Sequence, residues 1–349
     1  MTEFNYTGKI DIKQFLELAE NIPVIDVRSP GEFINGHIPG AHNIPLFSDE
    51  ERKAVGIRYS MEGRLSAILE GLKLSENSMH LKLEKALKIS SGGKLLVHCW
   101  RGGMRSEVMA WLFSLGKIET AILDGGYKSY RRYLHEYLAA TRKMIILGGL
   151  TGSGKTGILK VFSNSGKQVA DLEGIANHRG SAFGSIGESP QPSGEQFANL
   201  LFNALRKTDM NVPLWVEDES RNIGTVFMPE EFYLNMQNNP AIILMMDAGI
   251  RIRRLAREYR DYPADKVEAS ILKISRRMGG DRAGKAITAL RTGDLEGAIA
   301  IVLEYYDKAY MYGLKKRSPG NLLYVGTDTD DVESNAVKIY EASSSFIQT

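Results

Sequence analysis

The segment "KMIILGGLTGSGKT" (residues 143–156) joins an apolar run to a glycine-rich turn that ends in Lys-Thr. Gly149 is followed by four residues and then by Gly154, Lys155 and Thr156, which is the spacing of a P-loop. In such a loop the backbone N–H groups surround a phosphate, the lysine reaches its oxygens and the threonine is placed to hold Mg²⁺. The pattern therefore predicts a phosphate site made of Gly149, Gly152, Gly154, Lys155 and Thr156.

Further short apolar runs follow this segment and alternate with helix-like stretches. They are "KQVADLEG" (167–174), "VPLWVEDES" (212–220), "AIILMMDA" (241–248) and "NLLYVG" (321–326). Strands that alternate with helices indicate a mostly parallel sheet. Residues 141–349 are therefore predicted to form a P-loop NTPase-like α/β domain.

The first part of the chain shows the same alternation. Apolar runs at "IPVIDV" (22–27), "KLLVHC" (94–99) and "TAILDGG" (120–126) surround a helix-like stretch that begins near residues 103–105. Residues 1–140 are therefore predicted to form a separate α/β domain. The segment 47–93 within it is polar and mostly helix-like, and it carries no motif.

The stretch "HCWRGGMRS" (98–106) holds Cys99, the only cysteine of 349 residues. A strand that ends at Cys99 and a helix that starts a few residues later place the sulfur over a helix N-terminus, which favours thiolate. Arg101 and Arg105 add positive charge. A buried strand-end cysteine is the alternative, but apolar packing does not need two glycines and two arginines. We therefore interpret Cys99 as a nucleophile, with both arginines beside its substrate.

The stretch "VIDVRSPGEFINGHIPGAHNIPL" (24–46), followed by a strand-end cysteine loop, resembles the rhodanese family. The resemblance implies a rhodanese-like fold for the first domain. Asp26, Arg28, Glu32 and His37 lie in the matching stretch. We interpret Asp26 and Arg28 as a structural charged pair at the sheet edge.

Five residues separate Cys99 from Arg105, one more than in a sulfur-transferring rhodanese loop. This spacing also resembles the protein-tyrosine-phosphatase signature. A longer loop holds a larger group, and phosphate, or phosphate bearing a chalcogen heavier than sulfur, fits a cradle of N–H and arginine contacts.

A P-loop is expected to have an acidic partner at the end of another strand. Glu217, Asp218 and Glu219 follow one predicted strand, and Asp171 and Asp247 follow two others. The sequence leaves this choice open.

The loop "DLEGIANHRGSAFG" (171–184) combines His178, Arg179 and Ser181 with several glycines. A lone histidine is more often a surface or hydrogen-bonded residue than a catalyst. Beside Arg179 and Ser181, His178 is predicted to belong to an anion or substrate site.

Basic residues cluster in "RIRRLAREYR" (251–260) and in two later groups. Arginine suits bidentate phosphate contacts, so these runs are predicted to bind the phosphates of a nucleotide or a polynucleotide. The candidates are Arg251, Arg253, Arg254 and Arg257, followed by Arg276, Arg277, Arg282, Lys315, Lys316 and Arg317.

The formal net charge is only +2, so bulk charge does not indicate a nucleic-acid partner. The first twenty residues lack the pattern of a signal peptide, and no run approaches a membrane span. We expect a cytoplasmic protein without a membrane partner. A single cysteine cannot form an internal disulfide, which suits a reducing compartment, and no resident metal is predicted.

Taken together, "HCWRGGMRS", "GLTGSGKT", "DLEGIANHRGSAFG" and "VEDESRNIG" resemble the bacterial tRNA 2-selenouridine synthase family. The resemblance implies a transferase that replaces sulfur by selenium in 2-thiouridine at the tRNA wobble position, through an S-geranyl intermediate. It implies selenophosphate and geranyl diphosphate as co-substrates, no firmly bound cofactor, and an enzyme that supplies selenophosphate as a partner. We expect Cys99 to carry selenium and the P-loop to hold geranyl diphosphate, with Mg²⁺ at Thr156.

Three alternatives stay open on the sequence. The first is a rhodanese-fold cysteine phosphatase attached to a regulatory P-loop module. The second is a P-loop kinase with a non-catalytic rhodanese module, and the third is an RNA-binding adaptor.

Overall fold

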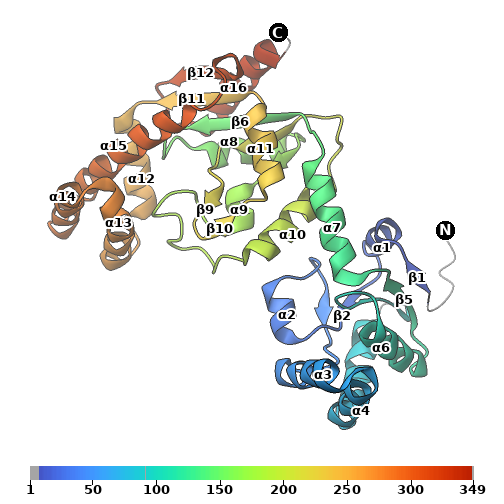
Figure 1. The fold of residues 1–349 in the computed structure, drawn as a ribbon. Helices are drawn as coiled ribbons and strands as arrows, with labels where there is room; N and C mark the ends of the chain where they lie inside the picture. The colour runs from blue at the N-terminus through green and yellow to red at the C-terminus, as the bar shows by residue number, and fades with distance from the viewer. Residues whose placement is uncertain (1–7, 91, 348–349) are drawn as a thin grey trace. The chain divides into compact units, whose positions relative to one another are not determined.

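The computed structural model describes residues 8–90 and 92–347. The chain divides into two compact units, Met1–Tyr137 and Leu138–Thr349. Helix α7 (Gly126–Ala139) contains the boundary between them (Figure 1).

The first unit is built on a five-stranded sheet in the order β1-β5-β4-β2-β3, with every pairing parallel. The three predicted strands form β2 (Val24–Asp26), β4 (Lys94–His98) and β5 (Glu119–Leu123). The outer strands β1 (Lys9–Ile10) and β3 (His42–Asn43) were not predicted, because two residues show no alternation.

Helices connect these strands, as parallel pairing requires. Helix α6 begins at Met104, as predicted, and the polar segment 47–93 forms α3, α4 and α5. The bounds are α1 (Ile12–Leu18), α2 (Pro30–Asn35), α3 (Asp49–Glu62), α4 (Arg64–Ser75), α5 (Met79–Ile89) and α6 (Met104–Leu115).

The second unit is built on another parallel sheet, in the order β12-β11-β6-β8-β7. Its strands are β6 (Met144–Gly149), β7 (Val169–Ala170), β8 (Leu214–Glu217), β11 (Ala241–Met246) and β12 (Leu322–Thr327). Each predicted run forms one of them, so the predicted α/β class is confirmed for both units. Strand β6 is central, which places the P-loop at the middle of the sheet.

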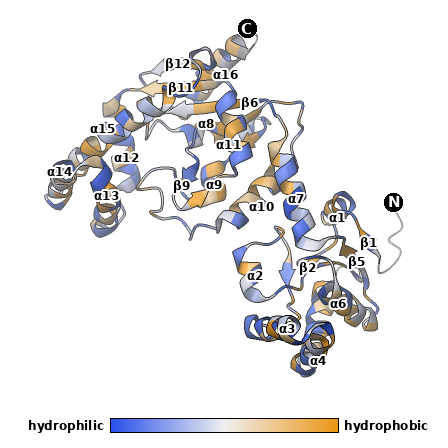
Figure 2. Ribbon diagram, in the orientation of Figure 1, coloured by the Kyte–Doolittle hydropathy of each residue, from blue (hydrophilic) through white to orange (hydrophobic). Residues whose placement is uncertain are grey.

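Two groups of helices complete the second unit. Helices α8 (Lys155–Asn164), α9 (Leu172–Ala176), α10 (Gly194–Leu205), α11 (Glu230–Asn238) and α16 (Val332–Ile347) accompany the strands. Helices α12 (Ala248–Tyr259), α13 (Ala264–Met278), α14 (Gly280–Arg291) and α15 (Leu295–Leu314) share a core of their own. Hydrophobic and hydrophilic residues alternate along this second group, as in amphipathic helices (Figure 2).

A short hairpin of β9 (Asn222–Ile223) and β10 (Val226–Phe227) was not predicted. Gly224 lies in its turn with a φ of +62°, a conformation that favours glycine. Among the described residues, no helix combines the length and the apolar character needed to cross a membrane.

Candidate functional site

Cys99 follows strand β4 directly and turns its side chain to the face that α6 covers. It is 3% exposed and shares an apolar cluster with Val97, Met109 and Phe113. Its Sγ lies 3.3 Å from the hydroxyl oxygen of Ser106, in the first turn of α6. The thiol thus lies beside the first turn of α6, as predicted, and it is also buried at the end of its strand, as the alternative interpretation expected, with the carbonyl oxygen of Gly103 4.0 Å from Sγ.

The residues after Cys99 form a loop with unused hydrogen-bond donors; we call residues 99–106 the cysteine loop. Within the described part of the chain, the N–H groups of residues 100–103 donate no hydrogen bond. The loop is held through its carbonyl groups instead, because Cys99 and Trp100 accept from the N–H groups of Tyr127 (2.8 Å) and Lys128 (3.0 Å). Free N–H groups beside a helix N-terminus make a cradle for an anion.

Gly102 is required by this geometry. Its φ is +63°, and a Cβ at this position would lie 2.3 Å from the carbonyl oxygen of Leu123. The glycine that the sequence places in the loop therefore permits the close approach of the next strand.

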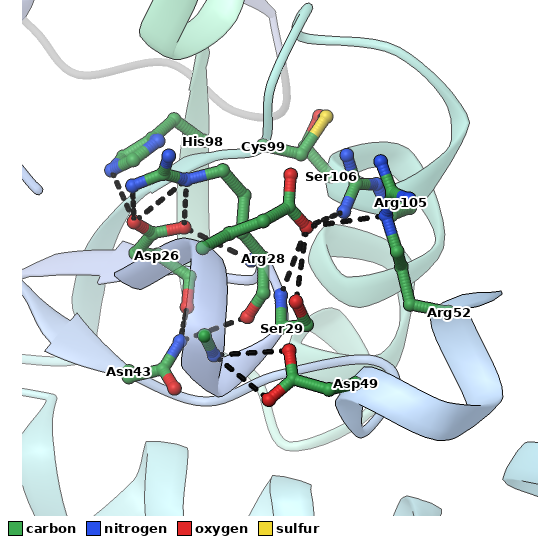
Figure 3. A network of polar contacts seen from close by, with 12 residues as sticks. Asp26, Arg28, Ser29, Asn43, Asp49, Arg52, His98, Cys99, Arg105 and Ser106 are labelled. Atoms are coloured by element: carbon green, nitrogen blue, oxygen red, sulfur yellow. Dashed lines mark hydrogen bonds and ion pairs between the residues drawn. The ribbon is translucent and has the colours of Figure 1, made fainter. Parts of the chain in front are cut away.

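The two arginines of the cysteine loop differ in their surroundings. Arg105 donates to Glu32 across 2.8 Å, and Arg52 lies 3.7 Å from the same carboxylate (Figure 3). Burial opposes ionisation of Glu32, but the hydrogen bond and the charge of Arg105 hold its pKa below the usual value. Arg101 is exposed and has no ion pair among the described residues. Arg105 is thus held beside the loop, and Arg101 is available to a ligand.

Asp26 and Arg28 form the predicted charged pair, but the pair is buried and does not lie at a sheet edge. Arg28 donates to Asp26 at 2.6 Å (Figure 3). Its guanidinium carbon lies 3.8 Å from the ring centre of Tyr127. Strand β2 pairs with both β3 and β4, so it is an interior strand, which corrects the predicted edge position. Burial would raise the pKa of Asp26, but His98 and Arg28 together hold it below its usual value. The pair stabilises the unit and has no catalytic contact.

His98 points away from the cysteine loop although it precedes Cys99. Successive residues of a strand face opposite sides, so His98 packs against Phe15 and Tyr127 on the other face. Burial lowers its pKa. In the matching stretch, His37 stacks on Phe33, with the ring centres 3.9 Å apart.

The P-loop has the predicted shape. Gly152 and Gly154 adopt φ values of +83° and +85°, and α8 begins at Lys155. Within the described residues, the N–H groups of residues 151, 152 and 154 donate no hydrogen bond. The Lys155 ammonium group donates to the carbonyl oxygen of Gly149 at 3.1 Å. The loop thus presents donors and a cation where a phosphate is expected to bind.

The acidic neighbour of the P-loop is Glu173, which the sequence interpretation missed. The Thr156 hydroxyl donates to Glu173 at 2.7 Å. Glu219 hydrogen-bonds with Glu173, and burial together with this carboxylate raises the pKa of Glu219 to about 8. A Cβ on Gly180 would lie within 2.8 Å of both carboxyl groups, so only a glycine leaves room for the two carboxyl groups at this position. Glu173 stands in the first turn of α9, two residues after the predicted candidate Asp171, and that proximity was the only signal in the sequence.

The other acidic candidates have partners of their own, and Asp218 is linked to the P-loop through Tyr310, whose hydroxyl oxygen accepts from the N–H of Gly149 at 3.0 Å. Glu217 is fully buried and accepts from the N–H of Leu172. Burial raises its pKa well above the usual value. Asp218 is bound by Arg317 and Tyr310, each at 2.7 Å.

The remaining two acids cap helices. Asp171 accepts from the N–H of Gly174 at the start of α9, and Asp247 accepts from that of Gly249 at the start of α12. An N-cap carboxylate stabilises its helix, so neither residue needs a phosphate-site role.

The fold gives the two predicted neighbours His178 and Arg179 different partners. Arg179 pairs with Glu188 at 2.7 Å and with Glu258, so its guanidinium is not free for a substrate. His178 is 8% exposed, and its Nδ1 has no partner among the described residues. Burial lowers its pKa, Lys273 lowers it further, and Glu188 opposes them. His178 therefore stays a candidate for substrate contact.

The basic run 251–260 splits between the core and the surface. Arg251 is 2% exposed and forms two hydrogen bonds to Asp307, at 2.7 and 3.0 Å, so it cannot contact tRNA as predicted. Arg254 lies at the P-loop, with its guanidinium carbon 3.0 Å from the position of a Cβ on Gly154. Arg253 and Arg257 are exposed, although Arg257 pairs with Asp330.

The later basic groups split in the same way. Arg317 is buried against Asp218 and the carbonyl groups of α11, which corrects its prediction as a phosphate contact. Exposed cations remain at Arg276, Arg277, Arg282, Lys315 and Lys316. Among the residues with described positions, no group of three or more His, Cys, Asp or Glu is placed to hold a metal ion.

Comparisons with known proteins agree with this geometry. The family described as "Rhodanese-like domain" matches residues 11–133, and the family described as "tRNA 2-selenouridine synthase AAA domain" matches residues 142–338. Three curated relatives carry the name tRNA 2-selenouridine synthase. The one from Nitrosomonas europaea is 33% identical and covers 84% of this chain and 90% of the relative. The one from Marinobacter nauticus is 34% identical and covers 90% and 95%.

The third relative, from Sulfurovum sp., is 35% identical and covers 88% of this chain and 93% of its own length. These matches extend through both units and include the cysteine loop and the P-loop of the chain. The chain therefore belongs to the tRNA 2-selenouridine synthase family.

Proposed function

We propose that this protein converts 2-thiouridine at the wobble position of tRNA into 2-selenouridine, in two steps that use two different anions. The observation that carries the proposal is the presence of two cradles of unused N–H groups in one chain of this family. One cradle contains the thiol of Cys99, and the other contains Lys155. Two activated co-substrates need two such sites.

The first step activates the sulfur. Thiocarbonyl sulfur leaves poorly, whereas an S-alkyl group leaves as a thiol. Alkylation by geranyl diphosphate forms the sulfur–carbon bond and releases diphosphate. Lys155, Arg254 and the N–H groups of the P-loop are the groups that hold this diphosphate, and Mg²⁺ at Thr156 would add a further positive charge.

The second step replaces the alkylated sulfur. Selenium from selenophosphate adds to the ring carbon, and geranyl thiol departs. Selenophosphate is a tetrahedral anion that matches the cysteine loop, with Cys99 as nucleophile and Arg101 and Arg105 at its rim. An enzyme that makes selenophosphate must supply this donor.

The tRNA is held through its phosphates by exposed cations of the second unit. Arg253, Arg276, Arg277, Arg282 and Lys316 have the exposure that such contacts require. The protein acts in the cytoplasm, where its tRNA substrate is found.

The test is nucleoside analysis of tRNA after incubation with the full chain. With geranyl diphosphate and selenophosphate we expect 2-selenouridine, and with geranyl diphosphate alone S-geranyl-2-thiouridine. Parallel assays with an aryl phosphate and with ATP examine the phosphatase and kinase alternatives. Turnover of either compound without any change in the nucleoside would refute the proposal.

A further inference from the structure

We infer that the Cys99 thiolate attacks the phosphorus atom of selenophosphate and releases hydrogen selenide, so that selenium reaches the tRNA without ever binding to sulfur. This inference rests on the proposed function and specifies the chemistry of the same site. It replaces the expectation that Cys99 carries selenium.

The thiolate could attack selenophosphate at phosphorus or at selenium, and the electron balance distinguishes these two reactions. Attack at phosphorus forms a sulfur–phosphorus bond and breaks the phosphorus–selenium bond. Selenium carries the proton of monoprotonated selenophosphate, so the electron pair of that bond leaves with it as the hydrogenselenide anion, HSe⁻, and no atom changes oxidation state. Water then breaks the sulfur–phosphorus bond, which releases phosphate and restores the thiolate. Hydrogen selenide adds to the ring carbon of the geranylated nucleoside and expels geranyl thiol.

Attack at selenium has a different balance. It would form a sulfur–selenium bond, and the electron pair would leave on phosphorus as phosphite, reduced by two electrons. The selenium on sulfur would be oxidised to the same extent. A second thiol would then have to reduce it before or during its transfer to the ring. Cys99 is the only cysteine of the chain, so the protein itself holds no such reductant.

The shape of the cysteine loop agrees with attack at phosphorus. The unused N–H groups of residues 100–103 and the N-terminus of α6 are suited to three equatorial oxygens around a phosphorus atom. A cradle for selenium would not need these donors, because selenide accepts hydrogen bonds weakly. Five residues between Cys99 and Arg105 leave room for a phosphoryl group.

The carboxylates around the loop explain why this substrate suits the site. A phosphate ester needs an acid to protonate the departing oxygen. Glu32 is bound by Arg105, and Asp26 is buried with Arg28 beside His98, whose side chain faces away from the cysteine loop. Neither is placed to donate a proton. The hydrogenselenide anion is stable at neutral pH, and because it already carries the proton of the selenophosphate it leaves without an acid from the protein.

Ser106 is the residue that assists the second half of the cycle. Its hydroxyl donates to the carbonyl oxygen of Gly103 at 2.8 Å, and the hydroxyl oxygen lies 3.3 Å from Sγ, so a rotation of the hydroxyl would aim the same proton at the thiolate that leaves when water attacks phosphocysteine. A hydrogen bond to a charged group is stronger than one between neutral groups. Removal of this hydroxyl should therefore slow the release of phosphate about tenfold or more and allow phosphocysteine to accumulate.

The first experiment supplies selenide directly. Full-length Cys99→Ala protein is incubated without oxygen with pre-geranylated tRNA and either selenophosphate or sodium hydrogen selenide. We expect no 2-selenouridine with selenophosphate and, with selenide, a rate within a few-fold of the wild-type rate with selenide. A reaction without enzyme measures the uncatalysed background. A variant that selenide fails to rescue, beside an active wild-type enzyme, would overturn the inference.

The second experiment follows phosphorus. Wild-type and Ser106→Ala proteins are mixed with ³²P-labelled selenophosphate, quenched, and examined for labelled Cys99, phosphate and phosphite. We expect labelled Cys99 in the variant and phosphate as the phosphorus product of both proteins. Formation of phosphite in an amount equal to that of 2-selenouridine would establish attack at selenium. That result would refute this inference and leave the proposed function intact. If the wild-type enzyme fails to convert geranylated tRNA both with selenophosphate and with selenide, the proposed function fails as well.

Discussion

The backbone N–H of Tyr127 donates a hydrogen bond to the carbonyl oxygen of Cys99 at a distance of 2.8 Å. The first turn of α7 thereby holds the backbone of Cys99, and the N–H groups of residues 100–103 stay unused. A helix N-terminus has N–H groups without intrahelical partners, and here two of them hold the loop. The shape of the cradle thus depends on a segment that the cysteine motif does not contain.

Gly126→Ala should distort the cysteine loop, although Gly126 is not part of that loop. The φ of Gly126 is +59°, and a Cβ would lie 2.4 Å from the carbonyl oxygen of Cys99. We expect selenium incorporation to fall about tenfold or more, since transfer depends strongly on geometry. Geranylation should persist. The matched control is Gly56→Ala in α3, where a Cβ meets nothing within 4 Å. Equal activity of the two variants would show that the close approach is unimportant.

Cys99→Ala should separate the two steps. Because alkylation is assigned to the P-loop, this variant should still alkylate 2-thiouridine and then stop, so that S-geranyl-2-thiouridine accumulates. Cys99→Ser should behave alike, since a serine hydroxyl is hardly ionised at neutral pH. Nucleoside analysis measures the result. If only unaltered 2-thiouridine is found, both steps need Cys99 and cannot be assigned to separate sites.

Lys155→Ala should give the complementary defect. The variant lacks the cation of the P-loop, so binding of geranyl diphosphate should weaken and 2-thiouridine should stay unmodified. The same protein should convert pre-geranylated tRNA when selenophosphate is supplied. The matched control is Lys160→Ala, an exposed lysine later in α8. Normal accumulation of geranylated tRNA in the Lys155 variant would indicate another ligand for this loop, such as a nucleotide.

Exposed arginines of helices α12 to α15 should contribute to tRNA binding. The combined variant Arg276→Ala, Arg277→Ala and Arg282→Ala should flatten the dependence of log affinity on log salt, by about 0.9 for each tRNA phosphate that these side chains neutralise in the wild type. Arg291, which pairs with Glu268, is the matched control position. An unchanged salt slope in the triple variant would place the tRNA elsewhere.

Glu219→Gln should change how stability depends on pH. The pKa of Glu219 lies near 8 in the folded chain, compared with 4.5 when it is unperturbed. In this pH range the folded state keeps a proton that the unfolded state has released. The free energy of unfolding therefore falls as pH rises from about 4.5 through 8. The amide of the variant removes this fall. Unfolding midpoints between pH 5 and 9 test it, with exposed Glu76→Gln as control. Parallel curves for wild type and Glu219→Gln would contradict the assignment.

The strands, the P-loop and the cysteine loop were predictable because each is encoded by contiguous residues. The turn after β6 needs glycine at Gly152 and Gly154 for its φ values, and the pattern of apolar runs marks the strands around it. The two-residue strands β1 and β3 and the hairpin β9–β10 escaped prediction, since their pairing depends on neighbours distant in the chain.

The candidate site was predictable only in part for the same reason. Five acids followed predicted strands, and nothing in their local sequence separates a helix cap such as Asp171 from a buried acid such as Glu217. Glu173 reaches Thr156 because β7, β8 and β6 are neighbours in the sheet. The order of strands is a property of the whole domain.

The sequence by itself determined the two α/β units, the cysteine loop and the P-loop, because these depend on spacing within a few residues. Only the tertiary structure decided that Arg251 is buried against Asp307 while Arg254 lies at the P-loop, and that Arg105 is held by Glu32. A charged side chain looks alike in sequence whether it ends in water or in the core. Its partner, supplied by a distant segment, makes its burial favourable, and that partner is known only when the chain is folded.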